Sequence, residues 1–440
     1  MRKALPFVFM TALLLSAVVS LSLLSHRSQQ AERILTEAYA AALYESAEDL
    51  QALAVTLDKT LISSDAPQLT QLLCRAAQLA DQAHNNLSFL PLSHEAMSPT
   101  LSFINQLADY AASLTGQIAQ TGSLDQEALR TLSNQRALCM QLGAQLALAR
   151  QEMATDRRAD VLSHALYTSP SAENRPIESV AEANHGMEYP TLVYDGAFSD
   201  AETSGQPKGL TGTAITSQQA IEAACAFVGE DKVLSAAPAP NTSGYIPAFG
   251  VTVTTSDLQL NVDVTVQGGK ILWMVPETAS FTPVLTSDAC SAAADAFLQA
   301  RGFGQMRQTG LQMYDGLCVM SFAAVQDGVV LYPDTVKVQV RMDTGDVVGF
   351  EAHLYWMNHT ERQLSKPTVT AEEAKARLSS AVSTEDGRLC IIPWHGGERL
   401  CWEFSVQHED SEYLIYLDAF TGHELDVKKV IPLNGGHLVA

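Results

Sequence analysis

Residues 413–425 read Tyr-Leu-Ile-Tyr-Leu-Asp-Ala-Phe-Thr-Gly-His-Glu-Leu, a run of aliphatic and aromatic residues that ends in a Thr-Gly turn. Such runs favour β-strands, and glycine tolerates the positive backbone φ that a tight hairpin turn requires. The same pattern closes two earlier stretches, at 262–273 and 336–348. The C-terminal half is therefore predicted to use one small antiparallel sheet three times.

Each of the three stretches begins with a threonine and an alanine-rich segment, at Thr216, Thr286 and Thr370. Gln219 and Glu373 lie three residues after two of these threonines, which is the spacing of a helix capping box. Each stretch is thus expected to be an α+β unit, with one helix packed on a small antiparallel sheet. The expected boundaries of the three repeats are 211–280, 281–360 and 366–432.

The segment from Gln30 to about Arg157 is rich in Ala, Leu, Gln and Glu, and its apolar residues recur every three or four positions. This periodicity predicts amphipathic helices. Short connections make neighbouring helices antiparallel, so an all-α antiparallel bundle is expected over 28–160. The expected helices lie near 29–62, 67–89, 95–120 and 124–156.

The first residues predict a membrane anchor. Leu5 to Leu24 carry no charge and are preceded by Arg2 and Lys3, and about twenty helical residues reach across a bilayer core. We expect 1–27 to be a cytoplasmic stub and a transmembrane helix, with the bulk of the chain extracytoplasmic. The alternative is a cleaved signal peptide, for which Ser20-Leu-Ser22 would be a weak cleavage site.

Residues 161–210 form a linker that is rich in Pro, Gly and Ser and lacks the helical period. Inside it, Tyr189-Pro-Thr-Leu-Val-Tyr-Asp-Gly196 is aromatic and β-prone and ends in an Asp-Gly turn. This segment, called the strap below, is expected either to cover a neighbouring domain or to bind a partner. The candidate partner contacts are Tyr189, Pro190, Leu192, Tyr194, Asp195 and Phe198.

The composition and the absence of known motifs argue against several classes of function. The formal net charge of -22 argues against nucleic-acid binding, which relies on Lys and Arg. The sequence has no Gly-x-Ser-x-Gly, Cys-x-x-Cys or phosphate-binding glycine loop. We therefore nominate no catalytic, cofactor-binding or metal-binding residue and expect the protein not to be an enzyme.

Two of the seven cysteines, Cys390 and Cys401, form the one plausible pair. A hairpin that turns at His395-Gly396 would place them opposite each other on adjacent strands. They are either a disulfide or two free buried thiols, and the odd total leaves at least one cysteine without an intramolecular partner.

The order of anchor, four helices, strap and three repeats resembles the germination protein YpeB family of spore-forming Firmicutes, and the repeats resemble PepSY domains. The segments that carry the resemblance are 103–110, 189–200, 207–212, 268–273 and 413–422. Ala197 departs from the family, which usually has Pro after this Asp-Gly. The resemblance covers nearly the whole chain.

The resemblance implies a non-catalytic protein at the spore inner membrane, anchored by one transmembrane pass. It implies a role in stabilising and regulating a SleB-type cortex-lytic enzyme that is needed for cortex peptidoglycan breakdown in germination. It implies no cofactor. The alternative is an extracytoplasmic PepSY-type sensor or protease-inhibitor ectodomain.

Overall fold

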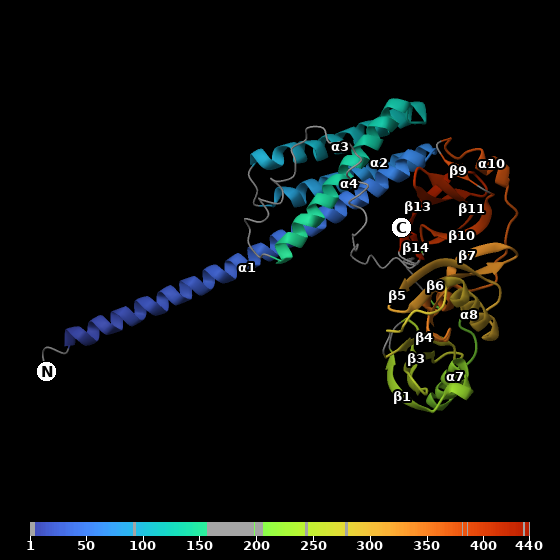
Figure 1. Ribbon diagram of the computed structural model, residues 1–440. Coiled ribbons are helices and arrows are strands. Elements are labelled where there is room, and N and C mark those ends of the chain that lie inside the picture. Colours follow the sequence, from blue (N-terminus) through green and yellow to red (C-terminus); the bar gives the residue numbers. More distant parts are fainter. Residues whose placement is uncertain are drawn as a thin grey trace. The chain divides into compact units, whose positions relative to one another are not determined.

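The computed structural model describes residues 5–90, 94–155, 198, 206–242, 245–277, 280–380, 382–384, 386–433 and 436–439 (Figure 1). The chain divides into two compact units. The helical unit comprises Met1–Leu61 and Asp65–Glu188, and the sheet unit comprises Ile62–Ser64 and Tyr189–Ala440.

The described part of the helical unit contains helices α1 to α4, which share one core of leucine and alanine side chains. Fully buried leucines from all four helices, such as Leu53, Leu73, Leu107 and Leu132, meet in this core. The last three helices begin and end within two residues of the expected bounds. The helices are α1 (Leu5–Ile62), α2 (Ala66–Ser88), α3 (His94–Thr121) and α4 (Gln126–Thr155).

The N-terminal helix differs from the expectation. Helix α1 runs without a break from Leu5 to Ile62, so the apolar run 5–24 and the first expected bundle helix are parts of one element. Throughout the residues that the structure describes, no helix is long and apolar enough to cross a membrane. The expected transmembrane helix is therefore wrong: the apolar run is not a separate span but continues into a polar, bundle-forming helix. Residues 1–4 of the expected stub lie outside the described residues.

In the residues that the structure describes, the sheet unit is built on one mixed sheet of fourteen strands. The first strands are β1 (Ser235–Thr242), β2 (Ala248–Thr254), β3 (Gln259–Thr265), β4 (Ile271–Pro276), β5 (Met306–Tyr314), β6 (Leu317–Gln326), β7 (Val329–Arg341) and β8 (Val347–Glu351). The remaining strands are β9 (Ser383–Thr384), β10 (Arg388–Trp394), β11 (Gly397–His408), β12 (Ser411–Asp418), β13 (Glu424–Leu433) and β14 (Gly436–Val439).

The three separate sheets expected from the sequence are wrong: among the described residues the strands of the repeats pair with one another in one sheet. Strand β4 of the first repeat pairs with β8 of the second, and β10 of the third repeat pairs in parallel with β7. Strand β14 pairs with β5, and β6 pairs with both β5 and β7. As a result the strands β7, β10, β11, β12, β13, β14, β5 and β6 follow one another in a closed circuit, called the strand ring below.

Helices cover the outside of this sheet, as Figure 1 shows for α7 and α8. Helices α7 and α8 share the largest core with strands of the first two repeats, and α10 packs on the third. The expected capping boxes are present at Thr216 with Gln219 and at Thr370 with Glu373. The shorter elements are α7 (Ser217–Val228), η1 (Glu230–Lys232), α8 (Ser287–Ala300), α9 (His353–Asn358) and α10 (Ala371–Lys375).

Two Asp-Gly hairpin turns give a matched test of this fold. Gly316 and Gly328 both have positive φ and both follow an aspartate with φ of 51°. A Cβ at Gly316 would clash with the carbonyl oxygen of Phe281, whereas a Cβ at Gly328 would meet nothing within 4 Å. Gly328→Ala should lower the free energy of unfolding by about 1 kcal/mol through φ strain alone.

Gly316→Ala should cost about 2 kcal/mol more than Gly328→Ala, because backbone atoms must also move. Urea denaturation of the two variants measures the difference. Equal stabilities would show that the segment before α8 does not pack against this turn as described.

Candidate functional site

The inside of the strand ring holds an aromatic and charged cluster around Phe198, the described residue of the candidate partner contacts. The Phe198 ring makes edge contacts with Tyr332 and Tyr416, at centroid distances of 5.4 and 5.1 Å. The Lys428 ammonium lies 4.9 Å from the centre of the Phe198 ring. Phe198 also has a φ of 63°, which is uncommon for a bulky residue. The ring contacts of Phe198 must therefore compensate for the free-energy cost of this backbone conformation.

A buried carboxylate lies in the same cluster. Glu403 is 2% exposed, and its Oε2 accepts a hydrogen bond of 2.6 Å from the Tyr332 hydroxyl. Its Oε1 pairs with the Arg388 guanidinium. Burial, and then the charge of Glu403, hold the pKa of Tyr332 well above its ordinary value, so this phenol remains a hydrogen-bond donor. Both oxygens of Glu403 are thus engaged with the protein itself.

The two cysteines of interest also face this interior. Cys390 and Cys401 are opposite each other in the β10–β11 ladder, and the hairpin turns at His395-Gly396, as predicted. Both are free and fully buried, and burial raises the pKa of each thiol.

The hairpin register explains why the thiols are free. A two-residue turn makes Trp394 and Gly397 a hydrogen-bonded pair, and counting back along the ladder makes Cys390 and Cys401 one as well. Opposed side chains are farther apart at such pairs than the Cβ spacing of about 3.5–4.5 Å that a disulfide needs.

The other candidate contacts, Tyr189, Pro190, Leu192, Tyr194 and Asp195, lie outside the described residues. The structure brings Phe198 together with the ring cluster, and the idea that the strap contacts a partner stays a prediction. No sequence pattern indicates Tyr332, Glu403 and Arg388, because they come from three strands and meet only when the ring closes.

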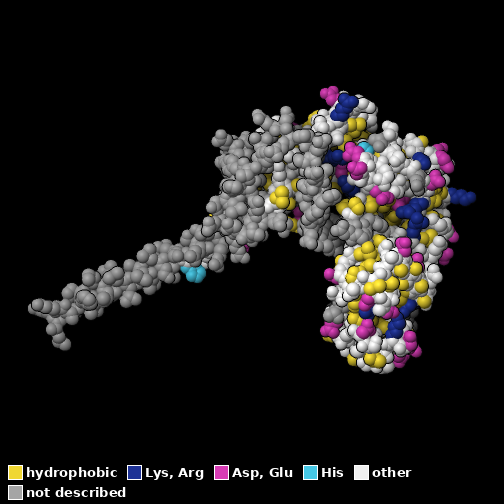
Figure 2. Space-filling view, in the orientation of Figure 1, with side chains coloured by type: hydrophobic (Ala, Val, Ile, Leu, Met, Phe, Trp, Pro, Cys, Tyr) yellow, Lys and Arg dark blue, Asp and Glu magenta, His cyan; other side chains and the backbone are white. Residues whose placement is uncertain are grey.

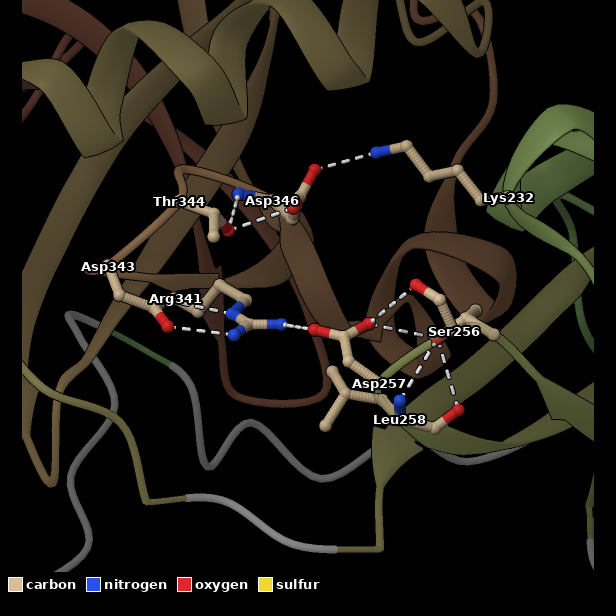
Figure 3. A network of polar contacts seen from close by, with 9 residues as sticks. Lys232, Ser256, Asp257, Leu258, Arg341, Asp343, Thr344 and Asp346 are labelled. Atoms are coloured by element: carbon tan, nitrogen blue, oxygen red, sulfur yellow. Dashed lines mark hydrogen bonds and ion pairs between the residues drawn. The ribbon is translucent and has the colours of Figure 1, made fainter.

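An ionic joint connects the first repeat to the second (Figure 3). Arg341, at the end of β7, is only 10% exposed and donates two hydrogen bonds of 2.7 Å to Asp343. It also pairs with Asp257 in the turn between β2 and β3. The hydrogen bonds from Arg341 lower the pKa of Asp343. Lys232 and Asp346 add a more exposed ion pair of 2.6 Å between the same two repeats.

A second ionic joint connects the second repeat to the third. Arg362 donates to both oxygens of the fully buried Asp334 on β7, at 2.8 and 2.7 Å. The same guanidinium donates to both oxygens of Glu398 on β11, at 2.8 and 2.7 Å. The His359 ring lies 2.7 Å from Asp334 through Nδ1 and stacks on Tyr355. Such bidentate pairs fix geometry as well as adding energy.

These charged groups are arranged to join elements. In the described part of the chain, no group of three or more His, Cys, Asp and Glu side chains is placed to hold a metal ion. Asp334 and Glu403 are the best-buried carboxylates of the ring, and each is bonded to an arginine.

Two models of known protein families match parts of both units. A family model described as "YpeB N-terminal" matches residues 27–159, and one described as "YpeB sporulation, PepSY1 and PepSY2 domains" matches 178–365. The chain belongs to the YpeB family. The resemblance stated from the sequence is thereby confirmed, as is the presence of PepSY domains.

Relatives in this family span almost the same length. "Sporulation protein YpeB" of Halalkalibacterium halodurans is 26% identical over 437 residues, which cover 95% of this chain and 96% of that protein. The protein of the same name from Bacillus subtilis is 24% identical over 417 residues, covering 91% and 92%. A solved structure, the Bacillus megaterium YpeB C-terminal domain, is 26% identical with a TM-score of 0.46 and covers 50% of this chain and 99% of that one.

The ring cluster makes a direct prediction about stability. Glu403→Gln removes the buried negative charge that pairs with Arg388 and replaces one of the two carboxylate oxygens, which accept from Arg388 and Tyr332, by an NH2 group that cannot accept. The free energy of unfolding should therefore fall by about 2–4 kcal/mol. Glu222→Gln, on the exposed side of α7, is the control and should change stability by less than about 0.5 kcal/mol. Denaturant titration compares the variants. If Glu403→Gln is as stable as the control, the carboxylate does not hold the ring together.

Proposed function

We propose that this YpeB-family chain is a non-catalytic partner of a SleB-type cortex-lytic enzyme at the spore inner membrane. In this role it stabilises the enzyme in the dormant spore and regulates the breakdown of cortex peptidoglycan during germination. The partner, the location and the germination role come from the family resemblance, and membership of a sporulation protein family supports them.

The proposal of a non-catalytic role is supported by the buried carboxylates, whose oxygens are bonded to other side chains of the protein. A glycan-cleaving enzyme needs two carboxyl groups that face a substrate. Here both oxygens of Asp334 are bonded to Arg362, and both oxygens of Glu403 are bonded to Tyr332 and Arg388. These acids connect strands and repeats, so we propose that the protein acts by contact with a partner at its surface.

The surface of the sheet unit is compatible with contact with another protein. In the view of Figure 2, hydrophobic, acidic and basic side chains are interspersed over this unit. Non-obligate protein interfaces are about as apolar as the rest of a protein surface, so such a mixed surface can serve as one.

Deletion of the gene tests the proposal. Dormant spores of the deletion strain should lack the SleB-type enzyme or contain much less of it, because the enzyme would lose its stabilising partner. Immunoblots of dormant spores measure the enzyme, with complementation by the wild-type gene as the control, and spore fractionation should find the protein with the inner membrane.

An enzyme level that is unchanged by the deletion would contradict the stabilising role. Recovery of the protein only in soluble fractions of the spore would contradict the proposed location.

A further inference from the structure

The free edge of the sheet is poorly suited to accept a partner strand. Strand β1 ends the strand path, whereas β6 at the other end pairs back onto β7. Pro238 and Pro240 lie in β1 at alternate positions, and proline has no N–H to donate. Pro238 is paired with Val251 of β2 and faces the outer edge, and Pro240 lies at the break in register between Ala239 and Thr242, so neither residue offers a donor to a further strand. A partner is therefore expected to dock on a face of the sheet.

The first repeat has one face on the helix side and one away from it. Val251 and Val262 point into the core that α7 shares. Residues one position away along the same strands, such as Thr252 and Asn261, point to the opposite face, are half-buried and hydrogen-bond to each other at 3.2 Å.

Trp273 is a large hydrophobic residue that lies exposed on this opposite face. It lies on β4, is 40% exposed, and is paired across the ladders with Asp263 on β3 and Glu351 on β8. Opposed residues in adjacent strands have their Cβ atoms about 4.5–5.5 Å apart on the same side of the sheet. The indole is therefore flanked by a carboxylate on each side.

These carboxylates retain capacity for a further partner. Asp263 accepts one hydrogen bond of 2.7 Å, from the Thr242 hydroxyl. The Glu351 side chain is 42% exposed and its ion pair with Lys337 is long, at 3.4 Å. The Lys337 side chain is 20% exposed, so the pair is only partly exposed, but at 3.4 Å it is long enough that a cation placed closer to Glu351 could compete for this carboxylate.

We propose that Trp273, Asp263 and Glu351 form a docking surface for a lysine- or arginine-bearing protein partner. A cation over an indole face is attracted by the ring, and two carboxylates beside the indole strengthen that attraction. Tryptophan is also among the residues that contribute most to interface affinity. This inference rests on the proposed function, for which it names the contact surface on the chain.

The net charge favours this partner over a second copy of the chain. At a formal charge of -22, two copies repel each other, whereas a basic surface is attracted. Self-association through Trp273 is therefore an outcome that would overturn the inference.

The test is the affinity of the full-length protein for the purified SleB-type enzyme. Trp273→Ala should raise the Kd by about tenfold or more, as for a residue at the centre of an interface. Phe420→Ala is the matched control, because Phe420 is an aromatic residue of similar exposure, 38%, in the third repeat. Trp273→Phe keeps an aromatic ring and should give an intermediate Kd, which guards against a folding defect in Trp273→Ala.

A second experiment tests the contribution of the two carboxylates to binding. The double variant Asp263→Asn with Glu351→Gln keeps the shape of the surface and should weaken binding mainly at low salt, reducing the dependence of Kd on salt concentration. Unchanged Kd values for the Trp273 variants, or an unchanged salt dependence for the double variant, would overturn the inference and leave the proposed function standing. Absence of binding by the wild-type protein would contradict both.

Discussion

Strand β10 pairs in parallel with β7 through Cys390 with Val330 and Ile391 with Leu331, and this short contact lets the strand ring close. The contact is short, so it depends on the neighbouring bonds from Arg362 to Asp334 and Glu398. Hydrogen bonds and bidentate ion pairs in a partly desolvated setting reinforce each other. If β10 separated from β7, Glu403 would keep Arg388, its neighbour on the β10–β11 hairpin, but would lose the hydrogen bond from Tyr332 on β7.

The same constraint bears on function. In the closed ring the buried acids are bonded within the protein, and the surface around Trp273, on the side of the first repeat away from α7, stays exposed. A protein built in this way is suited to hold a fixed shape and present it to a partner. The proposed role as a partner of a lytic enzyme needs that property, and it needs no chemistry at the ring cluster.

Local features of this fold were predictable from the sequence. The bounds of α2, α3 and α4, the capping boxes at Thr216 and Thr370, and the hairpin at His395-Gly396 all follow from residue patterns within a few positions of one another. The joining of the repeats was not predictable, because no local pattern indicates that β10 pairs with β7. The same holds for Arg341 and Asp257, which lie 84 positions apart and meet only through tertiary structure.

The two ionic joints and the ring should make the repeats of the sheet unit unfold together. Native-state hydrogen exchange as a function of denaturant measures this most directly, by following amides of β3 in the first repeat and β12 in the third. Both sets of amides should exchange through one opening with the same free energy and the same denaturant dependence. Exchange of β12 at a clearly lower free energy than β3, or the reverse, would show that the repeats unfold independently.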